Sequence, residues 1–239
     1  SRYDVDVVPH LICGGNTVEE IESRLDNLAF LGINNILALR GDSMTGEKRF
    51  TPTPGGYRYA SELVEGIRNY QGSSTYRRSK GLDTDDRYFC IGVGAYPEKH
   101  FEAPNIETDI ANLKKKVDAG ADYIITQMFF DNNILFNYLY KLRVHGIDIP
   151  VVPGIMPVTS GKQIPRITKL SGCCLPPRFK SIADKFGDDN NAMTQAGIAY
   201  ATDQVIDLFA NGISHVHIYS MNKPEVAQKI LENLSCILK

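Results

Sequence analysis

Short apolar runs alternate with amphipathic helical patterns along almost the whole chain, and this alternation constrains the fold more than any other feature. The runs are mostly continuous, as expected of strands that are buried on both faces. No hairpin signal joins one run to the next, so the pattern predicts parallel β-α-β units. The six predicted strands are residues 5–12, 34–39, 88–95, 122–128, 149–155 and 214–219.

Helical periodicity fills the intervals between these runs. In residues 18–31 apolar side chains recur at spacings of three and four. Thr17 precedes this pattern and Glu20 follows three residues later, which predicts a capping box. A second apolar stripe in residues 105–119 ends at Gly120. Further helices are predicted at 58–70, 133–145, 192–211 and 224–236, with shorter ones in 160–185 broken by Pro176 and Pro177.

Two parallel architectures fit this order: a (β/α)8 barrel and an open doubly wound sheet. Gly92 and Gly94 give only a GxG, and tyrosine and proline follow where the helix of a Rossmann fingerprint would start. We therefore favour the barrel. A closed barrel has eight units and this chain shows six, so we expect strands three to eight of a TIM (β/α)8 barrel family fold. Residues 1–239 then form a single, partial domain, and the polar stretch 71–87 is expected to be a mobile loop on the face opposite the site.

Composition narrows the classes of partner. The 239 residues carry a formal charge of −2, which gives no reason to expect nucleic acid or a membrane surface. No apolar stretch approaches the roughly 18 residues of a membrane span, and residues 1–12 do not resemble a signal peptide. The five cysteines lack a CxxC pair, so we expect reduced thiols in a cytoplasmic protein and no zinc site.

Polar or backbone-shaping residues stand at the predicted strand ends, where barrel enzymes place their chemistry. For Arg40, Gly41 and Asp42 the residues alone leave two readings open, a ligand site or an ion pair at the rim. The strand-end residues are Pro9-His10, Arg40-Gly41-Asp42, Tyr96-Pro97-Glu98 with His100, Thr126-Gln127, Pro153-Gly154 with Pro157, and Tyr219 with Asn222.

The helix predicted at 105–119 adds a second signal. Asp109, Asn112 and Lys116 share one face, with Lys115 beside it. A carboxylate, an amide and cations that project together suit a ligand rich in hydroxyls and phosphates, although a solvated helix face explains the same pattern. His215 and His217 alternate on the last strand without a carboxylate or cysteine at ligand spacing, so no metal site is expected.

Several motifs together resemble one known family. They are "PHLIC", "LALRGD", "YASELV", "YPEKH", "NLKKKVDAGADYIITQMFFD", "PVVPGIMPV" and "HIYSMNK", and they occur in this order over nearly all of the chain. The chain is similar to the methylenetetrahydrofolate reductases. That resemblance implies a (β/α)8 barrel that binds FAD and reduces 5,10-methylenetetrahydrofolate to 5-methyltetrahydrofolate with NADH or NADPH. It also implies a ping-pong hydride transfer, a role in methionine biosynthesis and a homo-oligomer.

The resemblance assigns roles to individual residues. The strand-end and helix residues are expected to converge at one mouth and to hold the flavin there. Asp42 is expected to tune the flavin and to bind folate, while Gln127, Gln163 and Lys223 complete the substrate set. The FAD contacts are His10, Arg40, Gly41, Asp42, Ala60, Tyr96, His100, Asp109, Asn112, Lys115 and Lys116.

The chain also departs from the family pattern. The family's catalytic acid is a glutamate in an aromatic "FEFFPP"-like run, and these 239 residues contain no such run. Lys223 stands where an arginine is usual, and Ile167 stands where some bacterial members carry a phenylalanine. A catalytically incomplete flavin- or folate-binding remnant, or a truncated fragment, is therefore the alternative function. An aldolase-like barrel is disfavoured because none of the predicted strands contains a lysine.

Overall fold

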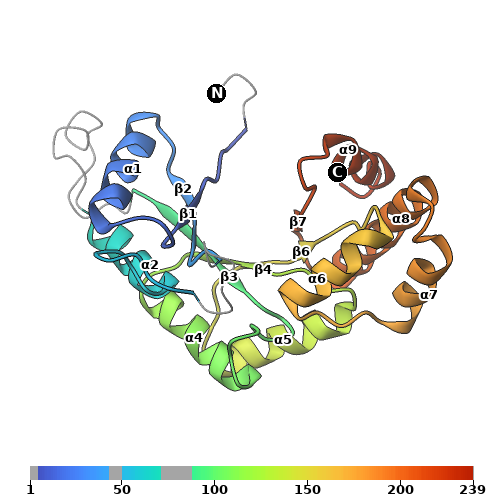
Figure 1. The fold of residues 1–239 in the computed structure, drawn as a ribbon, viewed down its shortest axis with the longest axis horizontal. Coiled ribbons are helices and arrows are strands. Elements are labelled where there is room, and N and C mark those ends of the chain that lie inside the picture. The colour runs from blue at the N-terminus through green and yellow to red at the C-terminus, as the bar shows by residue number, and fades with distance from the viewer. Residues whose placement is uncertain (1–4, 43–49, 71–87, 239) are drawn as a thin grey trace. The chain divides into compact units, whose positions relative to one another are not determined.

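Strands and helices alternate along the chain as the sequence predicts (Figure 1). The computed structural model describes residues 5–42, 50–70 and 88–238, so the predicted loop at 71–87 lies outside the described residues. The chain forms two compact units. Unit 1 comprises Ser1–Gly94 and Asn112–Ile124, and unit 2 comprises Ala95–Ala111 and Ile125–Lys239.

The described strands form two sheets, with the orders β1-β2-β3-β4-β5 and β6-β7. Each register that is defined, β1 with β2, β2 with β3 and β6 with β7, is parallel. Neighbouring strands follow chain order, without the reversal that a doubly wound sheet requires. The α/β fold class of the barrel family is therefore confirmed. The strands are β1 (His10–Ile12), β2 (Asn35–Leu39), β3 (Cys90–Ala95), β4 (Tyr123–Thr126), β5 (Val151–Val152), β6 (Gly154–Ile155) and β7 (His217–Ile218).

The helices begin and end close to their predicted limits. The first starts with the predicted capping box, in which the Glu20 backbone N–H donates to Thr17 Oγ1 and the Thr17 N–H donates to the Glu20 carboxylate. No helix in the described part of the chain is long and apolar enough to span a membrane. The helices are α1 (Val18–Phe30), α2 (Ala60–Asn69), α4 (Ile106–Asp118), α5 (Asn132–Val144), the 3-10 helix η1 (Gly161–Gln163), α6 (Ile164–Ser171), α7 (Pro177–Phe186), α8 (Asn190–Ala210) and α9 (Pro224–Asn233).

The prediction of a single strand at 149–155 is wrong in one respect, because Pro153 divides this segment into two strands, β5 and β6. Proline has no N–H to donate to a ladder. β5 ends before it in the first sheet, and β6 begins after it in the second. The Pro153 carbonyl accepts from His217 N–H at 2.8 Å, so the proline lies where the chain changes partners.

The strand predicted at 5–12 is paired over only its last three residues. Pro9 again removes a donor, although its carbonyl accepts from Leu37 N–H at 3.0 Å. Val5, Val7 and Val8 are exposed, which a buried strand would not allow. His10 therefore begins β1 and does not lie at its carboxyl end, so the predicted strand-end position of His10 is wrong.

Unit 1 buries β2 on both faces. Ile36, Leu37 and Ala38 are consecutive and buried, and Figure 1 shows α1 and α2 on the same side of β1 and β2. The Arg68 guanidinium links the segments that lead into β3 and β4. Arg68 on α2 donates to the carbonyls of Phe89 and Gly120 at 2.6–2.8 Å and pairs with Asp122.

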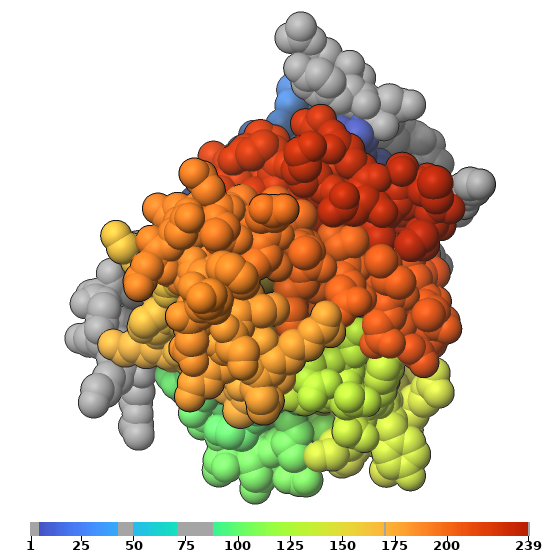
Figure 2. Space-filling view, turned by 90° about the vertical axis from the view of Figure 1, so that its right-hand side faces the viewer, coloured from blue at the N-terminus to red at the C-terminus, as the bar shows by residue number. Residues whose placement is uncertain are grey.

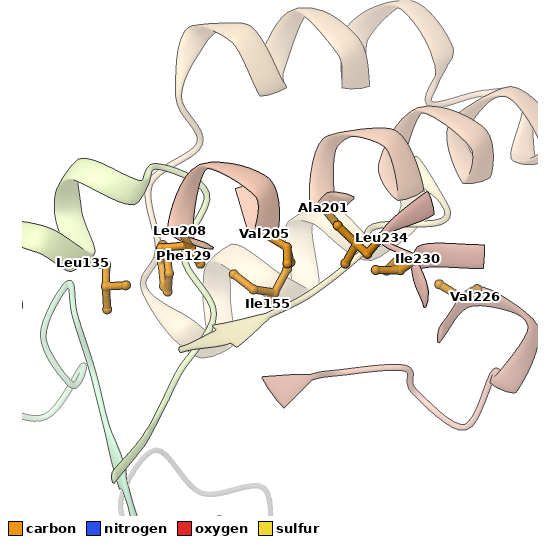
Figure 3. Packing of buried hydrophobic residues seen from close by; sticks show 9 residues of the cluster. All are labelled: Phe129, Leu135, Ile155, Ala201, Val205, Leu208, Val226, Ile230 and Leu234. Carbon is orange, nitrogen blue, oxygen red and sulfur yellow. The ribbon is translucent and has the colours of Figure 1, made fainter. Parts of the chain in front are cut away.

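Unit 2 packs around α8. One cluster of buried side chains comes from α5, β6, α8 and α9 and from the residues just before α5 and just after α9, and it packs against α8 (Figure 3). A second cluster, which includes Phe130, Phe179 and Met193, lies under α6 and α7. The helices α6 to α9 form most of the surface that is drawn in orange and red in Figure 2. The first cluster contains Phe129, Leu135, Ile155, Ala201, Val205, Leu208, Val226, Ile230 and Leu234.

Candidate functional site

The loops after β1 and β2 lie together in unit 1. The Gly14 N–H donates to the Arg40 carbonyl at 3.1 Å. Gly41 has φ +85°, and a Cβ on it would lie 3.4 Å from Ile12 Cβ. The positive φ therefore favours glycine at this position. The Arg40 guanidinium lies 5.0 Å from the centre of the Phe50 ring, a cation–π contact that orients it, and Asp42 is exposed.

Ala60 and His10 differ in how they can contact a ligand. Ala60 is the first residue of α2, and its side chain is buried. A ligand contact at this position would use the backbone at the start of the helix, where N–H groups have no partner within the helix. His10 is exposed at the start of β1.

Three predicted FAD residues contact one another in unit 2. After β3 the chain turns through Lys99, whose φ is +92°. The turn brings the Tyr96 and His100 rings into an edge contact with centroids 4.6 Å apart. The His100 N–H donates to the Asp109 carboxylate at 3.0 Å, which ties the turn to α4.

The imidazole of His100 has a defined tautomer when neutral. The Glu102 N–H donates to His100 Nδ1 at 3.1 Å. Nδ1 is therefore an acceptor, and the neutral ring carries its hydrogen on Nε2.

Two lysines of the predicted polar face of α4 make hydrogen bonds in unit 1. Lys115 is exposed, and its ammonium donates to Asn112 Oδ1 at 3.2 Å. Lys116 behaves differently, because its ammonium donates to the Gly94 carbonyl at 2.8 Å near the end of β3. Lys115 is thus the more accessible cation, and Lys116 also holds the strand to the helix.

Of the predicted substrate residues, Asp42 lies in unit 1 and the other three lie in unit 2, where two of them share a contact. Thr159, in the segment after β6, donates its backbone N–H to Gln163 Oε1 at 3.0 Å. Its hydroxyl oxygen accepts from the Lys223 ammonium, also at 3.0 Å. Gln127 uses its own Oε1 as an acceptor from Met128 N–H at 3.0 Å. Nothing in the sequence pattern identified Thr159, which joins residues far apart in the chain.

A hollow of about 300 Å³ lies beside Thr159 and Lys223. Its walls come from α8 and α9, and its lining mixes hydroxyls with charged side chains. Two of these, Lys229 and Glu232, pair with each other at 2.7 Å. The lining residues are Thr159, Thr194, Ile198, Lys223, Glu225, Val226, Gln228, Lys229 and Glu232.

Glu98, a predicted strand-end residue, lies in a setting that its position in the sequence does not indicate. One carboxylate oxygen, Oε2, accepts from Cys174 N–H at 2.8 Å. The other, Oε1, is buried and has no hydrogen-bond partner among the described residues. Burial raises the pKa of the Glu98 carboxyl above its ordinary value. No motif spacing links Glu98 to Cys174, because the contact spans 76 residues.

The parallel winding, with polar side chains after the strands, defines an α/β domain of the barrel family. A sequence model described as methylenetetrahydrofolate reductase matches residues 1–235. The chain is 36% identical over 240 residues to methylenetetrahydrofolate reductase 2 of Saccharomyces cerevisiae, covering 99% of this chain and 38% of that protein. It is 36% identical over 242 residues to methylenetetrahydrofolate reductase (NADH) 1 of Arabidopsis thaliana, covering 98% and 38%.

A bacterial relative is covered over more of its length. The chain is 31% identical over 233 residues to 5,10-methylenetetrahydrofolate reductase of Escherichia coli, covering 98% of this chain and 71% of that protein. The chain therefore belongs to the methylenetetrahydrofolate reductase family. It spans 38% of the length of the yeast and Arabidopsis relatives.

Proposed function

We propose that this chain is the flavin- and folate-binding part of a methylenetetrahydrofolate reductase. In this reading FAD is bound by the predicted residues, and 5,10-methylenetetrahydrofolate is reduced to 5-methyltetrahydrofolate with NADH or NADPH. The observation that carries the proposal is the match to the family over residues 1–235, which includes every predicted site residue. The convergence of these residues at a single mouth stays a prediction.

The donors and cations of each unit fit the chemistry of FAD. Unit 1 contributes the exposed Lys115 ammonium, the Arg40 guanidinium and the Gly41 peptide. In unit 2 the neutral imidazole of His100, whose ring contacts that of Tyr96, carries its hydrogen on Nε2. Diphosphate oxygens and ribityl hydroxyls accept such hydrogen bonds, and a cation balances phosphate charge. We assign the FAD contacts to these residues together with His10, Asp42, Ala60, Asp109, Asn112 and Lys116.

The chain's own residues have separable tasks in the proposed reaction. When bound, FAD supplies the group that accepts a hydride from NAD(P)H and passes it to the folate, which makes a ping-pong order the expected one. Asp42 disfavours negative charge on a neighbouring flavin and can accept from the folate's amino group. Gln127, Gln163 and Lys223 orient the folate through hydrogen-bond donors.

A second candidate function is binding without turnover. The observation that favours it is the absence from these 239 residues of the aromatic, glutamate-bearing run that resembles the family's acid. Opening the folate's five-membered ring needs a proton donor near the leaving nitrogen. A chain that binds FAD and folate but cannot transfer hydride would fit this second function.

FAD binding by the purified chain tests the proposal directly. A yellow preparation, or saturable quenching of flavin fluorescence on titration, is the expected result. Lys115→Ala should weaken FAD binding about tenfold, which corresponds to losing one charge-assisted hydrogen bond of about 1.5 kcal/mol. Lys114→Ala is the matched control, because Lys114 pairs with Asp118 on the same helix. A colourless chain that does not bind added FAD would contradict the proposal.

Turnover separates the two candidate functions. In a form that transfers hydride, Asp42→Asn should slow reduction of the folate more than reduction of the flavin by NAD(P)H. Stopped-flow absorbance of the flavin follows each half-reaction separately. Equal slowing of both halves would remove the role assigned to Asp42.

A further inference from the structure

We propose that Thr159 is a positioning residue that fixes Gln163 and Lys223 as hydrogen-bond donors toward the substrate. The inference deepens the proposed function and rests on it for the identity of the substrate. All of the contacts involved lie within unit 2. Nothing in the sequence motifs assigns a role to this threonine.

Thr159 is a buried polar residue with three contacts to three different elements. It is 5% exposed and follows β6. Its N–H donates to Gln163 Oε1 on η1, and its hydroxyl oxygen accepts from Lys223 Nζ in the loop before α9, both at 3.0 Å. Its carbonyl accepts from Thr194 Oγ1 on α8, also at 3.0 Å. Thr159 therefore links η1, α8 and the loop between β7 and α9 through hydrogen bonds.

The contact to Gln163 fixes which way its amide faces. A backbone N–H can donate only to the amide oxygen, so Oε1 must lie on the Thr159 side. The amide nitrogen then points away with two hydrogens, and Nε2 has no hydrogen-bond partner among the described residues. Gln163 consequently presents donors, and its carbonyl is already in use.

The contact to Lys223 leaves most of the ammonium available. A lysine ammonium has three hydrogens, and the Thr159 hydroxyl accepts one of them. Thr159 restrains a side chain that otherwise has many rotamers, which lowers the entropy lost when a ligand binds. Together the two positioned groups fit oxygen acceptors of a ligand, and a carboxylate or carbonyl supplies these.

A substitution of Thr159 can remove the contact to Lys223 while keeping the contact to Gln163. Gln163 is held by the backbone of Thr159, so it keeps its partner in any side-chain variant. Lys223 is held by the hydroxyl, so Thr159→Val removes its partner while keeping the shape of the side chain. Thr159→Ser restores the hydroxyl. Thr202→Val is a control of matched burial, since Thr202 is 6% exposed and its hydroxyl donates to the Ile198 carbonyl within α8.

The first measurement needs no substrate. Competitive labelling with trace acetic anhydride, read by mass spectrometry, gives the reactivity of Lys223 relative to Lys229 on α9. In Thr159→Val we expect this ratio to rise severalfold, because the ammonium loses its partner. Thr159→Ser and Thr202→Val should keep the wild-type ratio. An unchanged ratio in Thr159→Val would overturn the proposed positioning.

The second measurement is the dissociation constant for 5-methyltetrahydrofolate, the proposed product, on the same proteins. We expect about tenfold weaker binding in Thr159→Val and wild-type affinity in Thr159→Ser and Thr202→Val. Equal weakening in Thr202→Val would assign the effect to stability and overturn the proposal. A wild-type chain that does not bind this folate refutes the proposed function, while the labelling ratio still decides the role of Thr159. If valine prevents folding, Thr159→Ala, which lacks both γ substituents, carries the same tests.

Discussion

At the scale of single residues, burial decides how Glu98 behaves. Its Oε2 accepts from Cys174 N–H, while Oε1 is buried without a partner among the described residues. Desolvation raises the pKa of the Glu98 carboxyl, and the negative charge of Asp131 adds a smaller contribution in the same direction. The folded protein therefore holds this proton more strongly than the unfolded chain does.

This difference makes the stability of the protein depend on pH. Because the pKa of Glu98 is higher in the folded state, its contribution to stability is present below the ordinary glutamate pKa and is lost as pH rises through the raised value. Glu98→Gln cannot ionise and should not lose it. We expect the melting temperature of the wild type to fall relative to that of Glu98→Gln as the pH rises from about 4 to about 7. Parallel curves at constant ionic strength would contradict this.

The thiol of Cys174 should report on the same carboxylate. Cys174 is exposed, yet its hydrogen bond to Glu98 raises the pKa of the thiol. The thiolate is the reactive form, so Cys174 should be alkylated slowly for an exposed cysteine. Glu98→Gln should accelerate alkylation of Cys174 by iodoacetamide at pH about 8. The exposed Cys236 is an internal reference whose rate should not change.

At the scale of elements, α8 packs against the segment that carries Thr159. A Cβ on Gly197 would lie 1.9 Å from the Val158 carbonyl oxygen, which is closer than real side chains approach. The glycine therefore allows helix and backbone to touch. The close approach also places the helix that carries Thr194 against the residue preceding Thr159.

Gly197→Ala should consequently destabilise the protein, although alanine favours helix by about 1 kcal/mol. Overpacking a buried contact costs about 1–3 kcal/mol, and here the neighbour is backbone that cannot rotate away. Gln195→Ala, on the exposed part of the same helix, should change stability by less than about 0.5 kcal/mol. Urea denaturation followed by circular dichroism compares the two. A Gly197→Ala protein as stable as the wild type would show that α8 moves freely.

Helix boundaries could be predicted from the sequence because their signals are local. The capping box of Thr17 and Glu20 needs only residues three apart, and it forms as predicted. Strand limits were less accurate, since pairing depends on distant partners. Pro153 divides one predicted strand and Pro9 shortens another, although the apolar runs continue through both.

The candidate site was likewise predictable from the sequence only where its residues follow a local pattern. The residues that follow β2 and β3 could be located from the sequence, because parallel strands carry their ligand groups at their carboxyl ends. The contact between Thr159 and Lys223 could not, since 64 residues separate them and no spacing rule connects them. Glu98 was among the predicted strand-end residues, but its contact with Cys174 could not be predicted for the same physical reason.

At the scale of the whole molecule, neither unit is a continuous segment. The chain passes between them after Gly94, after Ala111 and after Ile124. Unit 1 therefore depends on contacts that bring residues 112–124 to the first 94 residues. Arg68 supplies such a contact, since its guanidinium donates to Gly120 and Phe89 carbonyls and pairs with Asp122. Asp122 in turn accepts from Ile91 N–H at 2.7 Å.

Arg68→Ala should therefore lower the free energy of unfolding by more than the loss of a single charged residue usually does. Its side chain is 13% exposed, and its removal takes the guanidinium donor from the Phe89 and Gly120 carbonyls and from the Asp122 carboxylate, which keeps the Ile91 N–H. Breaking a largely buried pair costs about 3–5 kcal/mol, and the partial exposure of Asp122, at 30%, favours the lower end of that range. Arg178→Ala is the matched control, because its pair with Asp203 is 69% and 55% exposed and is worth less than about 1 kcal/mol. Denaturant unfolding of both variants measures the difference, and similar losses of stability would mean that residues 112–124 are held in unit 1 by other contacts.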